Sequence, residues 1–338
     1  MTKLKAFMTQ FYKLNPAQTL KGHQHRSTHS IALLNYCENS VGTAQLPGVC
    51  YMYGNRHLIP FAQQPGGDHA QYLCQQNGDQ TLISNKYVLG TVNVTTNPSW
   101  NENFRFEFYE ESGELICIIT SQNYRCDDAS RHMSRSSNQY DKVLYSCFSF
   151  SISVVIHRSL TAVHIYYRYS PTEDLRIEII IYGIGGGRTV NDIQIMQHDS
   201  LIHRSSGLCV AFSRTCDFEN GVRGSRRRTF TATLAAQLCS IFLKKAYNKI
   251  KELFIPASQT SVSHAKAACI RDLRVSNNKA FATSMIVFLL HDGLYRKTMN
   301  NVLFGNQALQ IVQAIKQASA SAHREAMTLI TNTTMNLA

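Results

Sequence analysis

The sequence predicts a mainly β protein, an antiparallel β-sandwich followed by C-terminal helices, and therefore an α+β chain overall. From residue 49 to about residue 212, short runs of β-branched and aromatic residues are separated by clusters of Asn, Gly, Ser and Asp. Phe104, Phe106 and Phe108 alternate with polar residues, which is the two-residue period of a half-buried strand. Several strands in succession without helices between them favour antiparallel sheets. From Thr231 onward the apolar residues recur at helical spacing.

These two periods define the expected elements. The strand-like runs are short and are bounded by turn-forming residues; they are Thr81–Ile83, Tyr87–Thr95, Phe104–Tyr109, Glu114–Thr120, Val143–Ile156, Ala162–Tyr169 and Leu175–Tyr182. Helical spacing places a set of apolar side chains on one face, namely Leu234, Leu238, Ile241, Phe242, Ala246, Ile250 and Leu253. A last helix is expected over roughly residues 307–330.

Composition and charge limit the class of protein. Hydrophobic residues make up 44% of the 338 and charged residues 17%, which suits a globular chain with a real core and not a disordered one. The net charge of +12 favours acidic partners. Its densest group lies in a Gly- and Ser-containing stretch that we expect to be a solvated loop, with heparan-type polysaccharide as its candidate ligand: Arg223, Arg226, Arg227 and Arg228. No nucleic-acid-binding motif accompanies this group, so we expect no nucleic-acid partner.

The ten cysteines favour disulfides over a metal site. None forms a Cys-x-x-Cys pair, and the His25/His29 spacing has no cysteine pair beside it. Wide, irregular spacing suits long-range disulfides in an oxidising compartment. Two glycosylation sequons, at Asn93 and Asn332, agree with secretion. The first residues lack the apolar stretch of a signal peptide, so we expect either a truncated start or reduced cysteines.

One motif suggests an enzyme. A strongly apolar strand runs directly into the Gly-rich segment Gly183–Arg188, as a dinucleotide-binding turn would. Its last position is Arg188, and the residues that follow are too polar for a packed crossover helix. A turn between two antiparallel strands explains this pattern better. We expect no catalytic residues, cofactor or metal.

Four segments, in order, resemble the repulsive guidance molecule family and its von Willebrand factor type D-like domain. The first is Cys50–Leu58, followed by Phe61, which is similar to the family's Cys-x-x-x-Gly-Asp-Pro-His opening. The others are Cys74 with Thr81–Tyr87, then Leu208-Cys209 with Cys216, and finally Cys269–Leu273 with Phe281. The resemblance covers about residues 48–297. We therefore divide the chain into an N-terminal segment (1–47), a D-like domain (48–297) and a helical tail (298–338).

This resemblance implies a non-enzymatic extracellular or cell-surface protein that acts in guidance or growth-factor signalling. It would bind a neogenin-type receptor. It also implies disulfides, without assigned pairs, at Cys50, Cys74, Cys209, Cys216 and Cys269. The remaining cysteines, Cys37, Cys117, Cys126, Cys147 and Cys239, could complete the set.

The departures from the family have consequences. Its members are cleaved at the Asp-Pro bond, but these positions are Asn55 and Arg56 here, so we predict no cleavage. The resemblance also implies a bone morphogenetic protein co-receptor, but only 47 residues stand where the family has its growth-factor-binding helical module, which puts this partner in doubt. The C-terminal residues lack the hydrophobic tail of a lipid anchor.

Two other classes stay open. One is a secreted structural D-type domain that assembles through disulfides. The other is an intracellular basic protein that binds nucleic acid or a nucleotide at Gly183–Arg188.

Overall fold

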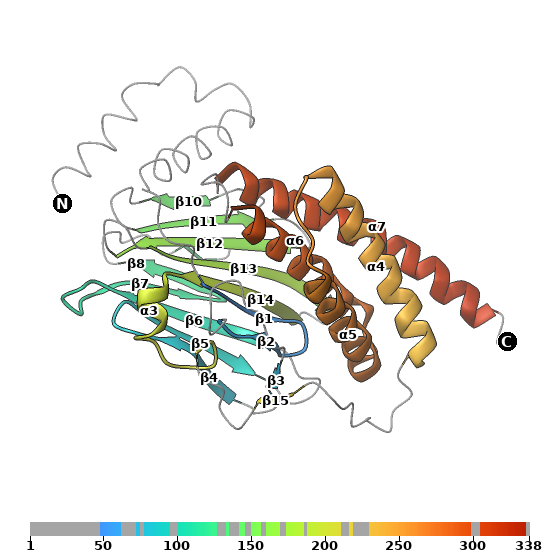
Figure 1. Cartoon of the computed structure of the whole chain (residues 1–338), viewed down its shortest axis with the longest axis horizontal. Helices are drawn as coiled ribbons and strands as arrows, with labels where there is room; N and C mark the ends of the chain where they lie inside the picture. The colour runs from blue at the N-terminus through green and yellow to red at the C-terminus, as the bar shows by residue number, and fades with distance from the viewer. Residues whose placement is uncertain are drawn as a thin grey trace, which may run out of the picture.

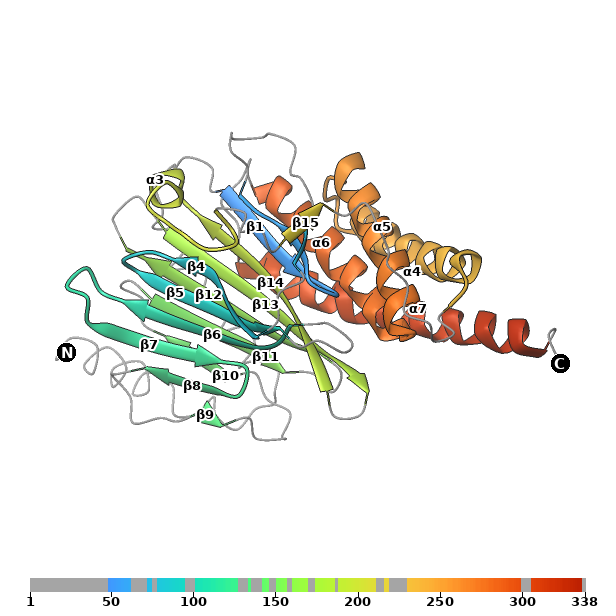
Figure 2. The same cartoon turned by 90° about the horizontal axis from the view of Figure 1, so that it is seen from below.

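The chain folds into three stacked layers, a small sheet, a large sheet and a group of helices (Figure 1). The computed structural model describes residues 48–61, 72–74, 78–94, 101–126, 133–134, 142–145, 150–156, 160–169, 174–185, 188–210, 216–218, 230–298 and 305–335. The predicted arrangement of antiparallel sheets followed by C-terminal helices is confirmed. Viewed from below, the helices of residues 232–335 lie on one side of the large sheet (Figure 2).

Both sheets are antiparallel. The nine-stranded sheet has, in spatial order, β10 (Lys142–Tyr145), β11 (Phe150–Ile156), β12 (Leu160–Arg168), β13 (Asp174–Gly185), β14 (Arg188–Gln197), β1 (Gly48–Tyr53), β2 (His57–Ile59), β3 (Tyr72–Cys74) and β15 (Cys216–Phe218). The six-stranded sheet is a meander of β4 (Gly78–Ser84), β5 (Val88–Val94), β6 (Asn101–Tyr109), β7 (Leu115–Thr120), β8 (Asn123–Cys126) and β9 (Met133–Ser134).

The large sheet is the middle layer, and its central strands are buried on both faces. In β13, Ile177 and Ile179 belong to the core shared with the small sheet, whereas Ile180 and Tyr182 belong to the core shared with the helices. Successive side chains of a strand point to opposite faces. A strand covered on both sides is therefore apolar at almost every position, which explains the continuous run of isoleucines in β13.

The helices form the third layer: α4 (Ala232–Glu252), α5 (Gln259–Ser276), α6 (Thr283–Thr298) and α7 (Gly305–Met335), with a short α3 (Asp199–Ile202) and a 3-10 turn η2 (Lys279–Ala282) elsewhere in the chain. The predicted helical face of α4 is confirmed, with Leu238, Phe242, Ala246 and Ile250 buried. Ile311 and Ile315 of α7 belong to the same core. None of the helices in the described residues combines the length and apolar character needed to cross a membrane.

One strand prediction is wrong. Val143–Ile156 was expected as a single strand, but it forms β10 and β11, which pair antiparallel with Lys142 opposite Val154. The run therefore contains two shorter strands of four and seven residues that pair with each other, and both lengths are usual for strands. The other predicted strands each correspond to one observed strand.

The Gly-rich segment Gly183–Arg188 joins β13 to β14, which pair antiparallel. The prediction of a turn between antiparallel strands is therefore confirmed. A dinucleotide-binding turn leads into a helix, whereas Arg188 begins a strand.

Two disulfides tie distant parts of the fold together. Cys50 on β1 is bonded to Cys209, 159 residues later in the sequence. Cys239 on α4 is bonded to Cys269 on α5. The described cysteines include no free thiol.

Candidate functional site

The turn between β1 and β2 is the candidate site. It consists of Gly54, Asn55 and Arg56, followed by His57, and all of these residues are buried. Gly54 has φ +55, and a Cβ at this position would lie 2.5 Å from Oδ2 of Asp272. Only glycine fits so close an approach in the left-handed region. Polar turns normally lie at the surface, so a buried one has to find its hydrogen-bond partners within the protein.

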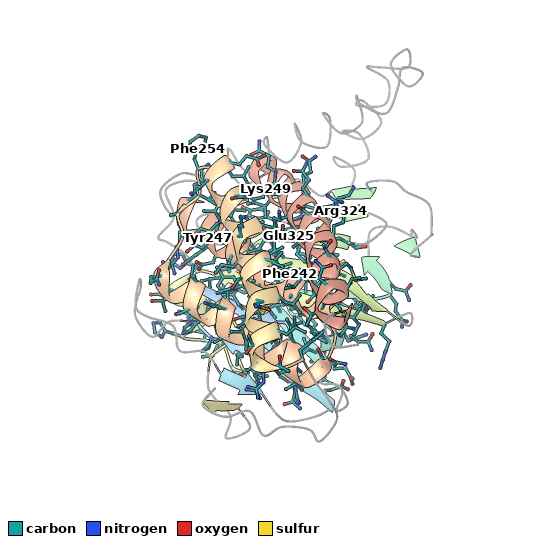
Figure 3. The ribbon with its side chains drawn as sticks, turned by 90° about the vertical axis from the view of Figure 1, so that its right-hand side faces the viewer. Phe242, Tyr247, Lys249, Phe254, Arg324 and Glu325 are labelled. Atoms are coloured by element: carbon teal, nitrogen blue, oxygen red, sulfur yellow. A yellow bond between two sulfur atoms is a disulfide. The ribbon has the colours of Figure 1, made fainter. Side chains whose placement is uncertain are left out.

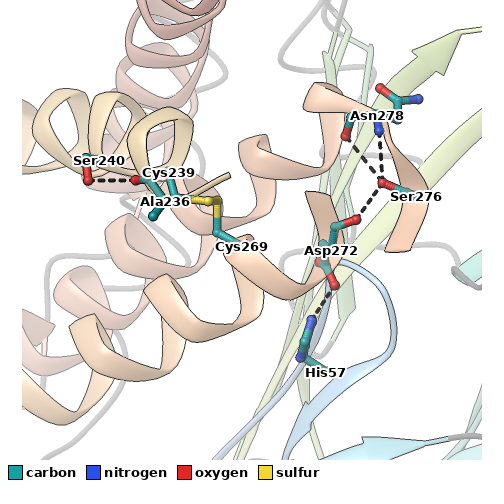
Figure 4. Close-up of a disulfide and its surroundings, with 8 residues drawn as sticks. All are labelled: His57, Ala236, Cys239, Ser240, Cys269, Asp272, Ser276 and Asn278. Carbon is teal, nitrogen blue, oxygen red and sulfur yellow. Dashed lines mark hydrogen bonds and ion pairs between the residues drawn. A yellow bond between two sulfur atoms is a disulfide. The ribbon is translucent and has the colours of Figure 1, made fainter. Parts of the chain in front are cut away.

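Asp272 on α5 supplies two of these partners. The backbone N–H of Asn55 donates to Oδ2 of Asp272 at 3.0 Å, and Nε2 of His57 donates to Oδ1 at 2.7 Å. The side chains of His57 and Asp272 are 0% and 1% exposed, so water does not screen the contact. Figure 4 shows this pair beside the Cys239–Cys269 disulfide, which lies one helical turn before Asp272.

Asp192 on β14 holds the other end of the turn. Its Oδ1 accepts the backbone N–H of Gly54 at 2.8 Å and the hydroxyl of Ser284, on α6, at 3.1 Å. Tyr182 in turn hydrogen-bonds to Ser284. Burial raises the pKa of Asp192 to about 7, although the Gly54 N–H and the Ser284 hydroxyl act in the opposite direction. This carboxyl is therefore partly protonated near neutral pH.

Arg56 is the most strained residue of the turn. Its φ of +66 is unusual for a bulky side chain, and the residue is 8% exposed. Burial, assisted by the charge of Arg271, lowers the pKa of Arg56 to about 10. The Oδ1 atom of the adjacent Asn55 is buried without a hydrogen-bond partner in the structure. Strain and unsatisfied polar groups cost stability, and they concentrate at functional positions.

A second buried polar row crosses the large sheet beneath α6. His164, Glu178, Gln194 and Tyr51 face one another on four neighbouring strands. His291 on α6 brings its Nδ1 to 3.5 Å from Glu178 Oε2. The hydroxyl of Tyr51 accepts from Gln194 at 3.0 Å. The helix therefore crosses the sheet over a line of charged and polar groups within an otherwise apolar interface.

The two carboxyl groups beside the Gly54–His57 turn accept hydrogen bonds from the protein's own backbone. Both carboxyl groups accept hydrogen bonds from backbone N–H groups of the turn, and none of the turn residues lines a small pocket of about 140 Å³ found elsewhere in the described residues. That pocket is lined by Lys86, Tyr87, Tyr169, Ser200, Leu201 and Arg204. In the described part of the chain, no group of three or more His, Cys, Asp or Glu side chains is arranged to hold a metal ion. The site therefore links the large sheet to the helices through buried hydrogen bonds.

The structure brings some predicted residues together. Of the predicted disulfide cysteines, Cys50 and Cys209 bond to each other and Cys269 bonds to Cys239. Cys74 and Cys216 lie directly opposite each other on β3 and β15.

The other predicted positions lie apart from the turn. Asn93 is half-buried on β5, where its Nδ2 donates to Oδ1 of Asp79 at 2.7 Å, and Asn332 is exposed on α7. The basic group Arg223, Arg226, Arg227 and Arg228 lies outside the described residues.

Sequence reasoning missed Asp192, Asp272 and Ser284 as site residues. Asp272 lies within the family-like segment Cys269–Leu273, but nothing in the sequence links it to His57, 215 residues away. Asp192 and Ser284 carried no motif. Neither lies within an apolar run, since Asp192 follows Asn191 and Ser284 follows Thr283, so no local pattern distinguished them from other polar residues.

Replacing Asp272 tests whether its hydrogen bonds link the turn of the large sheet to α5. Asp272→Ala leaves the Asn55 N–H and the His57 ring buried without their acceptor, so the free energy of unfolding should fall by about 3–5 kcal/mol. Urea unfolding measures this change. Arg274→Ala, on the same helix but only half-buried, is the matched control and should change stability by about 0.5 kcal/mol or less. Equal effects of the two substitutions would show that the contact does not hold the turn.

The raised pKa of Asp192 predicts that the free energy of unfolding depends on pH. Because its folded pKa of about 7 exceeds the ordinary 3.8, the folded state keeps a proton that the unfolded state releases. Its contribution to stability is complete below about pH 4 and is lost as the pH rises to about 7. Asp192→Asn stays neutral and should remove a decline on the order of a few kcal/mol across that interval. Unfolding curves across this interval for wild type, Asp192→Asn and the exposed control Asp79→Asn check this; an unchanged profile in Asp192→Asn would contradict it.

No protein-family model matches the chain, and no curated protein matches it in sequence. Function therefore has to be inferred from the residues and from their positions in the fold.

Proposed function

We propose that this chain is a non-enzymatic extracellular recognition protein of the repulsive guidance molecule type, whose β-sheet unit is a von Willebrand type D-like domain that binds a neogenin-type receptor. One observation supports this proposal above others. The four sequence segments that resemble the family are far apart in the chain, yet they contact one another in the fold.

Each of these contacts is specific. The first segment joins the third through the Cys50–Cys209 disulfide. The third segment also pairs with the second, since the backbone N–H of Leu208 donates to the carbonyl of Thr81 at 3.0 Å, and that of Cys209 to Leu82 at 2.9 Å. The first joins the fourth through His57 and Asp272. Motifs matched by chance have no reason to meet, whereas parts of a shared domain core do.

The disulfides support an extracellular location. Cys50–Cys209 and Cys239–Cys269 are buried, and structural disulfides of this kind form in oxidising compartments. Asn332 is exposed, as a glycosylated residue must be.

The proposal extends to some partners only. Residues 1–47, where the family carries much of its growth-factor binding, lie outside the described residues, so the proposal does not extend to bone morphogenetic proteins. Heparan-type polysaccharide at Arg223–Arg228 stays a prediction for the same reason. The nucleotide-binding alternative loses its motif, because Gly183–Arg188 joins two antiparallel strands.

Receptor binding is the direct test. The secreted, oxidised protein should bind an immobilised neogenin-type ectodomain and should not bind an unrelated immunoglobulin-type ectodomain. Protein that has been reduced and alkylated loses its disulfides, Cys50–Cys209 and Cys239–Cys269 among them, and is the matched negative control. Binding that is absent, or equal on both ectodomains, would overturn the receptor assignment. A covalent oligomer that reduction disperses would instead favour the structural D-type class.

The Asn55–Arg56 bond should stay intact. Asn55 lacks the carboxyl that attacks its own carbonyl in the family, and Arg56 forms an ordinary amide. A cleaved chain would be held together by Cys50–Cys209, which spans the bond, so intact mass has to be measured after reduction. We expect one chain in mature protein. Arg56 has φ +66, which proline cannot adopt, so an Asp-Pro bond would change this turn. Asn55→Asp alone restores the attacking carboxyl and is the matched variant; two fragments from the wild type would refute the prediction.

A further inference from the structure

The end of α4 contains a residue that neither the fold nor the proposed function explains. The helix ends at Leu253, and the next residue, Phe254, has φ +51. The backbone N–H of Phe254 donates to the carbonyl of Lys251, and that of Ile255 to Ile250. These two bonds form a Schellman motif, and the buried Ile250 and Ile255 supply its usual apolar contact. Glycine is the common residue at the left-handed position of this motif, because a side chain there is strained.

Phe254 gains nothing from the core in return for this strain. Its side chain is 87% exposed, the largest value among the large apolar residues of the described chain. Figure 3 shows it at the edge of the helical layer, beyond Lys249 and Tyr247. By contrast, α5 ends with Asn277 in the left-handed region, a residue that tolerates it. A strained and exposed phenylalanine reduces both stability and solubility, which indicates that its ring contacts something outside the chain.

The surroundings of Phe254 are basic. The helical layer, residues 230–298 and 305–335, contains twelve Lys and Arg against four Asp and Glu, a net charge of +8 out of the +12 of the whole chain. Lys251 is exposed beside Phe254, and Lys297 Nζ donates to the carbonyl of Leu253 at 3.0 Å. Lys249 is paired with Glu252 at 2.5 Å, the one acidic residue of this end of α4. Around Phe254, the described residues therefore place three lysines, Lys249, Lys251 and Lys297, against one acidic residue, Glu252.

We propose that this end of the helical layer docks on an anionic phospholipid surface, with Phe254 inserted at the headgroup level and the surrounding lysines over the lipid charges. A protein partner fits less well, because stable protein interfaces need an apolar patch at their centre. The described residues offer only Phe254 and Met327 as large exposed apolar side chains. A membrane surface needs only a shallow apolar anchor combined with positive charge. This inference rests on the surface of the helical layer alone and depends neither on the receptor nor on the extracellular location proposed above.

Vesicle co-sedimentation of the full chain tests the inference. Wild type should bind phosphatidylcholine vesicles that contain phosphatidylserine, should not bind vesicles of phosphatidylcholine alone, and should dissociate as salt is added. Phe254→Gly should bind at least about tenfold more weakly. The same variant should be more stable, with its unfolding equilibrium constant lowered about fivefold, because glycine relieves the strain.

Two further variants make the result specific. Phe254→Trp keeps an aromatic anchor and should retain binding. Met327→Ser removes the other exposed apolar side chain and should leave binding unchanged. The proposal is overturned if wild type does not bind the anionic vesicles or if Phe254→Gly binds them as tightly as wild type. It is equally overturned if heparin or single-stranded oligonucleotide binds in a Phe254-dependent way while vesicles do not.

Discussion

Two buried carboxylates, Asp192 and Asp272, hold the backbone of the Gly54–His57 turn, and the placement of the helices on the sheet depends on this contact. Asp192 belongs to the large sheet and Asp272 to α5, so the turn is fixed from two layers at once. Apolar surfaces allow several registers of similar energy, because the hydrophobic effect is non-directional. A short hydrogen bond such as His57–Asp272 is satisfied in one register only. The polar contact therefore specifies the position of α5, while burial of apolar surface stabilises it.

Along the rest of the interface between the large sheet and the helices, polar contacts likewise specify the position of the helices and apolar burial stabilises it. The row that contains Glu178 and Gln194 meets His291 of α6 in the way that Asp192 meets Ser284. The Cys239–Cys269 disulfide then fixes α5 to α4 close to Asp272. As a result, the helices are a third layer of one structure and not an appendage to a β-sandwich. The opposite face of the large sheet packs on the small sheet through apolar residues such as Ile177 and Phe106.

Local patterns in the sequence were sufficient to predict the strands and helices, but not which of them contact one another in the fold. The period-2 alternation of Phe104–Phe108 and the helical face of α4 each depend on neighbours a few residues away, so both could be predicted. The pairing of His57 with Asp272, or of Cys50 with Cys209, depends on how layers stack, which no local period encodes. The single strand predicted for Val143–Ile156 was wrong for a related reason: its apolar run is compatible with one strand or with two that pair with each other, and pairing is not encoded in a local period.

Segments far apart in the sequence form one core around the Gly54–His57 turn. Disulfide mapping tests it most directly, by digesting the non-reduced protein from its native source and identifying the linked peptides by mass. One linked pair of peptides should contain Cys50 and Cys209, and another should contain Cys239 and Cys269. Cys50 found as a free thiol, or linked to any other cysteine, would contradict both the fold and the contact between the family-like segments.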